Sequence, residues 1–248
     1  MKLKNKIAIV TGGSSGIGQT TAILLAKEGA DLLITYNKHE NGAIFTKNEI
    51  NKLGRKCEIF KADMNDINDV KNVIYKTIEI YSGIDILVNN AGGGNFIEFF
   101  EDTVENLDYL LNINVKSIFV LSQLAAKEMI KRGGGSIINI TSISGISVND
   151  PGLISYCTSK AAANMLTRGI AKALGKYNIK VNAILPGSID TEGNKSTSKE
   201  VLEEHIKRTP LQRIGKTNEI ASMVVFLVSN DSNFTTGSLI VIDGGLTI

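Results

Sequence analysis

Short runs of Ile, Val and Leu recur along the chain, and segments with helical spacing separate them. The runs show little alternation of apolar and polar residues, which is typical of strands buried on both faces of a parallel sheet. They lie at Ile7–Val10, Leu32–Thr35, Glu58–Phe60, Ile84–Val88, Ser136–Ile140, Lys180–Leu185 and Ser238–Ile242. Helices are predicted at Gly16–Glu28, Asn41–Leu53, Ile67–Tyr81, Val104–Arg132, Tyr156–Tyr177 and Thr217–Ser229.

The repeated alternation of strand and helix predicts the fold class. Apolar strands joined through helices are typical of an α/β fold in which a parallel sheet carries helices on both faces. A chain of 248 residues with 43% hydrophobic residues can bury one sizeable core. We therefore expect residues 1–248 to form a single domain with a doubly wound, Rossmann-type sheet of about seven strands.

Charge and cysteine content argue against several classes of partner. The 27 basic and 25 acidic residues leave a formal charge of +2, and no long basic run favours nucleic acid or a membrane surface. Two cysteines cannot build a disulfide framework, and no apolar run suits a signal peptide or a membrane span. We expect a cytoplasmic protein that binds neither nucleic acid nor membrane.

Small, polar and turn residues follow six successive predicted strands. Ligands of open parallel sheets bind beyond the carboxyl ends of the strands, so these residues outline one binding edge. They are Thr11–Gly18, Tyr36–Lys38, Asp63–Met64, Asn89–Gly92, Thr141–Ser142 and Pro186–Gly187. The least regular stretch, Gly187–Arg213, is expected to be a working loop or lid.

Glycines at 12, 16 and 18 follow the first strand with the spacing G-x-x-x-G-x-G. Such glycines let the backbone approach a pyrophosphate, and the next helix points its amino end at the phosphate charge. A tight turn between strand and helix would also use glycines. The position directly after the first strand favours a dinucleotide site.

Tyr156 and Lys160 lie four residues apart in a predicted helix and therefore share a face. A free phenol titrates near pH 10, and a nearby ammonium with an oxidised nicotinamide would lower that pKa. Tyr156 would then exchange a proton with a substrate oxygen that Ser142 also binds. On its own, such a pair also occurs as a packed tyrosine beside a solvated lysine.

Several motifs in register resemble the short-chain dehydrogenase/reductase family over nearly the whole chain. The glycine loop resembles the cofactor loop of that family, and Asn89–Gly92 resembles its fourth-strand motif. Pro186-Gly187 with Thr191, and Asp243–Gly245, resemble later motifs. Asn114, Ser142, Tyr156 and Lys160 match the catalytic tetrad in order and approximate spacing.

The resemblance implies a role for each member of the tetrad. Tyr156 is the general acid/base, and Lys160 lowers its pKa and holds the nicotinamide ribose. Ser142 orients the carbonyl or alcohol, and Asn114 supports a water that relays protons to Lys160. The activity implied is hydride transfer between a nicotinamide and a carbonyl or secondary alcohol.

The resemblance also implies the cofactor contacts. They are Gly12, Ser14, Ser15, Gly16, Ile17, Gly18, Asn37, Lys38, Asp63, Met64, Asn90, Ala91, Gly92, Tyr156, Lys160, Ile189 and Thr191. After the second strand no acid occurs before Glu40 to bind the adenosine ribose and repel a 2′-phosphate, and Lys38 could pair with that phosphate. NADP(H) is therefore favoured modestly over NAD(H), although Ser15 replaces a basic residue that many NADP(H)-preferring relatives carry.

Two groups within the family are the nearest in pattern, and both substrates stay open. One is the β-ketoacyl-acyl-carrier-protein reductases, for which Lys131 and Arg132 could face an acidic carrier protein. Tyr177 replaces a basic residue common in them, and the segment before Tyr156 lacks their Gln-x-Asn. The other group is the glucose-type and polyol dehydrogenases. The substrate pocket would involve Gly94–Phe100 (including Phe96, Phe99 and Phe100), Ile143–Ser155 and Gly187–Arg213.

Three other classes of protein fit the sequence less well. A serine hydrolase with Ser142 as nucleophile needs a histidine base, and only His39 and His205 exist, without a G-x-S-x-G turn. A zinc enzyme lacks ligand spacing. A non-catalytic dinucleotide sensor would bind cofactor without turnover, and the intact tetrad argues against it. The family resemblance further implies a homotetramer that pairs the helices Val104–Arg132 and Tyr156–Tyr177.

Overall fold

A parallel sheet of seven strands forms the centre of the computed structural model, which describes residues 1–148, 150–192 and 199–248. The strand order is β3-β2-β1-β4-β5-β6-β9, and every neighbouring pair is parallel. The strands are β1 (Ile7–Val10), β2 (Asp31–Tyr36), β3 (Cys57–Lys61), β4 (Ile86–Asn89), β5 (Gly135–Ile140), β6 (Ile179–Pro186) and β9 (Leu239–Ile242). The predicted fold class is confirmed.

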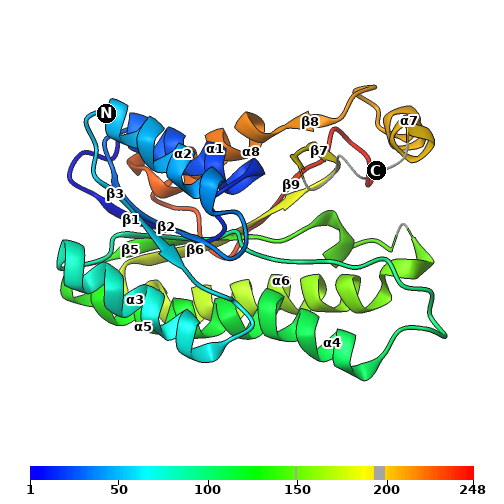
Figure 1. Ribbon diagram of the computed structural model, residues 1–248, viewed down its shortest axis with the longest axis horizontal. Coiled ribbons are helices and arrows are strands. Elements are labelled where there is room, and N and C mark those ends of the chain that lie inside the picture. The colour runs from blue at the N-terminus through cyan, green and yellow to red at the C-terminus, as the bar shows by residue number, and fades with distance from the viewer. Residues whose placement is uncertain (149, 193–198) are drawn as a thin grey trace.

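Helices cover both faces of this sheet (Figure 1). One layer contains α1 (Gly16–Lys27), α2 (Glu40–Lys52) and α8 (Thr217–Val228). The other contains α3 (Ile67–Tyr81), α4 (Val104–Leu111), α5 (Ser117–Lys131) and α6 (Ile154–Leu174). Short 3₁₀ turns occupy Ile143–Gly145, Pro151–Leu153, Gly175–Tyr177 and Asn230–Ser232.

The lack of alternation in the strands follows from burial on both faces. Ile9 of β1 pairs in register with Leu33 and Leu87, and all three pack in the layer of α3 and α5. The next residue, Val10, packs with its own partners in the layer of α1 and α8. Successive side chains point to opposite faces of the sheet. Because both faces are buried, odd and even positions of each strand must both be apolar.

One predicted helix, Val104–Arg132, is interrupted. A π-helical turn at Asn112–Lys116 joins α4 to α5 and places Asn114 at its centre. Ser117 N–H is bonded to the carbonyl of Asn112, five residues back. Such turns are rare inside α-helices and occur often at functional sites.

The stretch Val104–Lys131 is long and apolar enough to cross a membrane by length and composition alone. Half of its most apolar window is buried inside the protein. This burial is the pattern of a core helix packed on a sheet.

The predicted loop Gly187–Arg213 contains regular structure. β7 (Ile189–Asp190) pairs in parallel with β8 (Gly215–Lys216), and α7 (Lys199–Arg208) lies between them. The rest of the prediction falls partly on residues 193–198, which lie outside the described residues.

Arg132, expected as a contact for a carrier protein, is exposed and is also paired within the protein. Its guanidinium donates two hydrogen bonds of 3.0 Å to the Asp85 carboxylate, which is 5% exposed. Lys131 is paired with Glu128 one turn earlier. The Arg132 side chain therefore holds the end of α5 against the start of β4 and compensates a buried carboxylate.

Candidate active site

A cleft of about 510 Å³ opens at the carboxyl ends of the strands. The strand order reverses between β1 and β4, and ligands of such sheets bind at this switch point. Twelve predicted cofactor residues line the cleft: Gly12, Ser14, Ser15, Gly16, Ile17, Asn37, Lys38, Met64, Asn90, Ala91, Gly92 and Thr191. The structure thus gathers residues from five separate loops around one space.

Hydrogen bonds between strand ends fix the floor of the cleft. The Thr11 hydroxyl accepts from the backbone N–H groups of Asn90 and Ala91, at 3.0 and 2.9 Å. The Asn90 amide donates to the carbonyls of Thr11 and Gly12, at 2.9 and 3.1 Å. The loops after β1 and β4 are therefore held together before any ligand binds.

Gly12 turns the chain into α1 with a φ of +65°, a region that favours glycine. Its N–H donates to the Thr35 hydroxyl at 3.1 Å. Helix α1 begins at Gly16 directly after the turn, so its free N–H groups face the cleft. A phosphate group would be bound there by backbone donors and the helix dipole.

Gly18 does not line the cleft but packs beneath it. A Cβ at this position would lie 2.2 Å from the Gly12 carbonyl oxygen and 2.4 Å from Asn90 Nδ2. We expect Gly18→Ala to displace the glycine loop, weaken dinucleotide binding by roughly tenfold or more, and cost about 1–3 kcal/mol of stability. Titration calorimetry and thermal unfolding measure the two effects.

Gly169→Ala is the matched control. Gly169 lies within α6, and a Cβ there meets nothing within 4 Å. It should leave binding unchanged and stabilise the helix by about 0.5–1 kcal/mol. Equal dinucleotide affinity in both variants would contradict the proposed packing of the glycine loop.

The four predicted catalytic residues meet at the Gly92 end of the cleft. A Cβ on Gly92 would lie 2.7 Å from Asn114 Oδ1 and 3.3 Å from Lys160 Nζ. A Cβ on Gly94 would lie 2.8 Å from the Tyr156 ring. Glycines at these positions therefore let the loop after β4 run directly along the tetrad.

The π-helical turn fixes Asn114. Its side-chain amide donates to the carbonyl of Gly93 at 2.9 Å and to the Ser159 hydroxyl at 3.0 Å. Its Oδ1 accepts from the Gly93 N–H at 3.2 Å. Asn114 is 1% exposed, so it ties the loop after β4 to α6 from within the core.

Lys160 is buried with little compensation. Its ammonium lies 3.5 Å from the carbonyl oxygen of Ile140 and 5.6 Å from the centre of the Tyr156 ring. Burial lowers the pKa of Lys160 to about 8. Hydroxyl groups of a bound ribose would supply the missing acceptors, as the family resemblance implies.

Burial decides the direction of the Tyr156 pKa. Burial raises it, and the hydrogen bond with the Ser142 side chain only partly offsets that effect. The expected lowering by Lys160 does not decide the pKa, because desolvation of the phenolate dominates. The positive charge of a bound oxidised nicotinamide would lower the Tyr156 pKa, because it favours the phenolate.

The adenosine end of the cleft contains Asn37, Lys38 and His39, all exposed. The Tyr36 hydroxyl donates to Glu40 at 2.8 Å. Asp63 does not line the cleft: its carboxylate accepts from the Asn65 N–H at 2.9 Å. Ala62 and Met64 form the wall there instead, so an adenine ring would contact apolar side chains.

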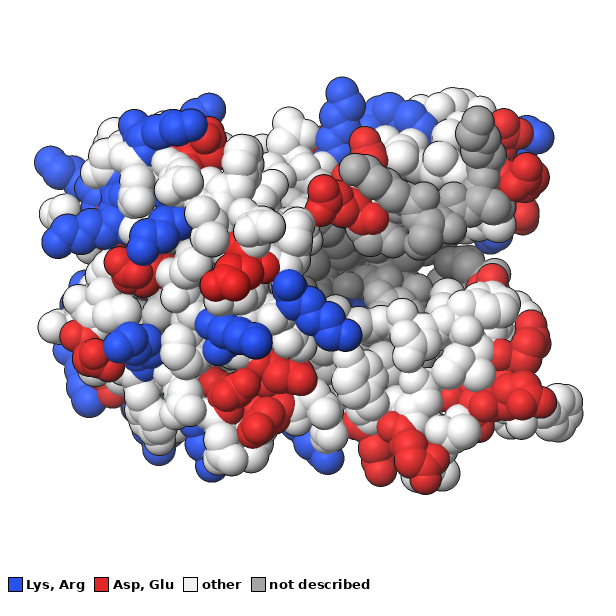
Figure 2. Space-filling model, viewed as in Figure 1, with Lys and Arg blue, Asp and Glu red and all other residues white. Residues whose placement is uncertain are grey.

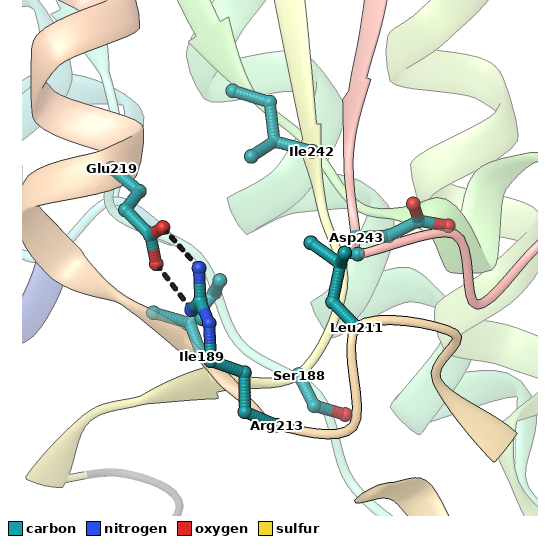
Figure 3. A pocket seen from close by; sticks show the side chains of 9 residues that line it. Ser188, Ile189, Leu211, Arg213, Glu219, Ile242 and Asp243 are labelled. Carbon is teal, nitrogen blue, oxygen red and sulfur yellow. Dashed lines mark hydrogen bonds and ion pairs between the residues drawn. The ribbon is translucent and has the colours of Figure 1, made fainter.

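Ile189 also lies away from the main cleft. Its side chain is 4% exposed and borders a separate cavity of about 80 Å³, closed by the Arg213–Glu219 ion pair (Figure 3). Two hydrogen bonds of 2.9 and 2.7 Å join that pair. The Ile189 side chain thus supports β7, and only neighbouring Thr191 reaches the cleft.

Sequence reasoning missed several residues that line the cleft: Thr35, His39, Ala62, Tyr109 and Ile113. Thr35 directly precedes Tyr36, and Ala62 directly precedes Asp63. Extending each strand-end segment by one residue toward the amino end would therefore have included both. Tyr109 and Ile113 come from the interrupted helix. Nothing in the apolar spacing of that helix marked them as lining residues.

The geometry suits an enzyme that binds a nicotinamide dinucleotide better than it suits a serine hydrolase. His205 Nδ1 lies 2.9 Å from the Ser188 hydroxyl, so it is not a base for Ser142, and His39 lines the adenosine end. Within residues 1–148, 150–192 and 199–248, no group of three His, Cys, Asp or Glu could hold a metal ion. The glycine cradle, the α1 terminus and the buried ammonium together fit a dinucleotide with a ribose at Lys160.

Comparisons with known proteins agree. A family model described as enoyl-(acyl carrier protein) reductase matches residues 12–247. The chain is 38% identical over 248 residues to a 3-oxoacyl-acyl-carrier-protein reductase of Thermotoga maritima, with all of both proteins covered. It is 34% identical over 249 residues to an L-rhamnose 1-dehydrogenase of a Sphingomonas species, covering 99% of this chain and 98% of the relative.

A solved structure is equally similar. The short-chain dehydrogenase of Burkholderia cenocepacia in complex with NADP has a TM-score of 0.95 and 36% sequence identity, with both chains fully covered. The protein is an oxidoreductase that acts on CH–OH or carbonyl groups with a nicotinamide cofactor. The chain therefore belongs to the short-chain dehydrogenase/reductase family.

Proposed function

We propose that the protein reduces a carbonyl with NADPH, with Tyr156 as the acid that protonates the substrate oxygen. The observation that carries the proposal is the convergence of Asn114, Tyr156 and Lys160 on the Gly92 end of the dinucleotide cleft. Ser142 is hydrogen-bonded with Tyr156. Two hydroxyls are thereby directed at one substrate oxygen.

When bound, the cofactor supplies a hydride to the carbonyl carbon or accepts it from the alcohol. Tyr156 donates its phenolic proton to the developing alkoxide, so the carbonyl becomes an alcohol without a free charge. Ser142 donates to the same oxygen and orients it. Lys160 stabilises the resulting phenolate, and Asn114 fixes the loop after β4 beside them. In the reverse direction Tyr156 accepts the alcohol proton.

The remaining site residues are proposed as cofactor contacts. Gly12, Ser14, Ser15, Gly16 and Ile17 would bind the pyrophosphate over Gly18. Asn37, Lys38, Met64 and the backbone near Asp63 would bind the adenosine. Asn90, Ala91, Gly92 and Thr191, with the backbone of Ile189, would lie along the nicotinamide half.

We expect a preference for NADP(H) that depends on Lys38. Lys38 lines the cleft and is exposed, and the NADP complex of the Burkholderia relative supports the same cofactor. Lys38→Ala should weaken NADP(H) by roughly tenfold and leave NAD(H) nearly unchanged, because one charged hydrogen bond to a 2′-phosphate is lost. Fluorescence titration with both cofactors measures this. Equal effects on both cofactors would remove the case for a 2′-phosphate contact, and exposed Lys56→Ala serves as the control.

A 3-oxoacyl thioester is our first substrate proposal, because the Thermotoga reductase is 38% identical over the full chain. A sugar or polyol is the second, because the rhamnose dehydrogenase is nearly as similar. A thioester carried by an acyl carrier protein is the less favoured form of this substrate, because such carriers are acidic and the surface beside the tetrad is acidic too. The segment from Gly92 to Val115, beside the tetrad, has five acidic residues and no basic one, and Figure 2 shows acidic groups over α4.

A substrate panel tests the reaction class. Acetoacetyl thioesters, with and without a carrier protein, and aldoses are incubated with each nicotinamide cofactor, and nicotinamide absorbance is followed. Turnover of one class identifies the substrate. Cofactor binding without turnover of any carbonyl or alcohol would favour a dinucleotide sensor instead.

We further propose a cytoplasmic homotetramer of one catalytic domain covering residues 1–248. The helices expected at its interfaces carry exposed apolar side chains, among them Phe119, Ile130 and Met165. These side chains would be covered by a second copy of the chain. Light scattering of the purified protein measures the assembly.

A further inference from the structure

The segment Gly94–Asp102 forms a wall beside Tyr156. The Gly94 backbone runs against the tyrosine ring, where a Cβ would clash. Two residues later, the Phe96 ring packs on Gly152, where a Cβ would lie 2.6 Å from the ring. The Ile97 N–H donates to the Gly152 carbonyl at 2.9 Å. This wall therefore leans on the turn that begins α6.

Asp102 joins the end of the wall to α6. Its Oδ2 accepts from the Ser155 hydroxyl at 2.5 Å, and its Oδ1 accepts from the Asn106 amide at 2.7 Å. Asn106 in turn accepts from the Asn95 amide at 3.1 Å, near the start of the wall. Both ends of the segment are thus connected to one carboxylate, which contacts the residue directly before Tyr156.

This carboxylate is charged near neutral pH. The donors Ser155 and Asn106 hold the pKa of Asp102 below its ordinary value. Bonds of this kind to an ionised group are shorter and more directional than neutral ones. Ser155 is 8% exposed, so its hydroxyl is oriented inside the protein while Asp102 lies nearer the surface.

We propose that Asp102 is a positioning residue for the carbonyl substrate, acting through Ser155 on Tyr156 and through Asn106 on the wall. The proposal rests on the proposed function, because it assumes that Tyr156 meets the substrate at this wall. Asp102 itself is half-buried and touches no reacting atom. Its role follows from geometry: the wall and the start of α6 hold the carbonyl substrate in place beside Tyr156.

Kinetics of Asp102→Ala and Ser155→Ala test the proposal. We expect each variant to raise KM for the carbonyl substrate by about tenfold and to lower kcat by a smaller factor. The reason is that the wall, which contacts the substrate, should shift more than the Tyr156 hydroxyl. Cofactor affinity should be unchanged, and the melting temperature should shift only slightly. Ser155→Thr keeps the hydroxyl and should restore KM. Asp108→Asn removes an exposed charge of α4, outside the wall, and should behave as the wild type.

The double variant separates coupling from coincidence. If Asp102 acts through Ser155, the two substitutions together should raise KM no more than Asp102→Ala alone. Additive effects, an unchanged KM, or a lower melting temperature with normal KM and kcat would each overturn the proposal.

Hydrogen–deuterium exchange tests the same contacts without turnover. Peptides covering 94–102 and 150–156 should exchange faster in Asp102→Ala and Ser155→Ala, and as in the wild type in Asp108→Asn. If the wild type reduces no substrate, the proposed function fails. Faster exchange in the two variants would still show that Asp102 and Ser155 hold the wall and the start of α6 together. Unchanged exchange in both peptides would overturn the proposal whatever the activity.

Discussion

Tyr156→Phe is expected to lower kcat for carbonyl reduction by about a thousandfold, within the range for loss of a general acid. The ring that packs along Gly94 is retained, and only the hydroxyl that bonds with Ser142 is removed. Dinucleotide affinity should therefore stay within about twofold of the wild type, because the floor of the cleft is unaffected. Steady-state kinetics and fluorescence titration measure the two quantities.

Tyr75→Phe provides the control, since Tyr75 is 56% exposed on α3, away from the cleft. It should leave both kcat and affinity unchanged. Retained turnover in Tyr156→Phe would show that another group protonates the substrate. Loss of cofactor binding in that variant would show that the Tyr156 hydroxyl serves mainly to bind the cofactor and not to transfer a proton.

Lys160→Met should abolish turnover and at the same time stabilise the fold. Methionine has a similar length but needs no solvation, whereas the acceptor found for the buried ammonium among the described residues, the Ile140 carbonyl, is 3.5 Å away. The pKa of Lys160 falls from 10.5 to about 8, which corresponds to a penalty of roughly 3 kcal/mol near neutral pH. A gain of roughly 2–4 °C in melting temperature for each recovered kcal/mol is expected.

The sign of the pH dependence makes this test sharper. The penalty is complete below the folded pKa of about 8 and disappears above the unfolded value of 10.5, where the lysine is neutral in both states. The stability advantage of Lys160→Met should therefore shrink as pH rises through this window. Lys172→Met, on an exposed position of the same helix, should show no such trend. A Lys160→Met protein less stable at neutral pH would contradict uncompensated burial.

The sheet was predictable because burial on both faces leaves a simple signal. Ile9 and Val10 point to opposite layers and are both apolar, so their run is continuous. The cleft was predictable for a related reason: strand ends share one edge, so residues far apart in sequence, such as Gly12 and Asn90, converge.

Other features depend on contacts that no local pattern encodes. The partners of Asn114 in the π-helical turn, Gly93 and Ser159, come from other elements of the fold. The bidentate contact of Arg132 with Asp85 joins residues 47 apart in the chain, and no local pattern marks it. The raised pKa of Tyr156 follows from burial, which sequence spacing to Lys160 does not report.

The central claim is that one group, Tyr156, exchanges the proton in both directions. It is tested most directly by the pH dependence of kcat/KM for the best carbonyl substrate and for its alcohol. Reduction requires the phenol and should slow as pH rises, whereas oxidation requires the phenolate and should quicken. The pKa seen in oxidation should be the lower one, because the positive charge of the oxidised nicotinamide favours the phenolate. Tyr156→Phe should lose both limbs. Profiles that rise or fall together, or that persist in Tyr156→Phe, would contradict the account.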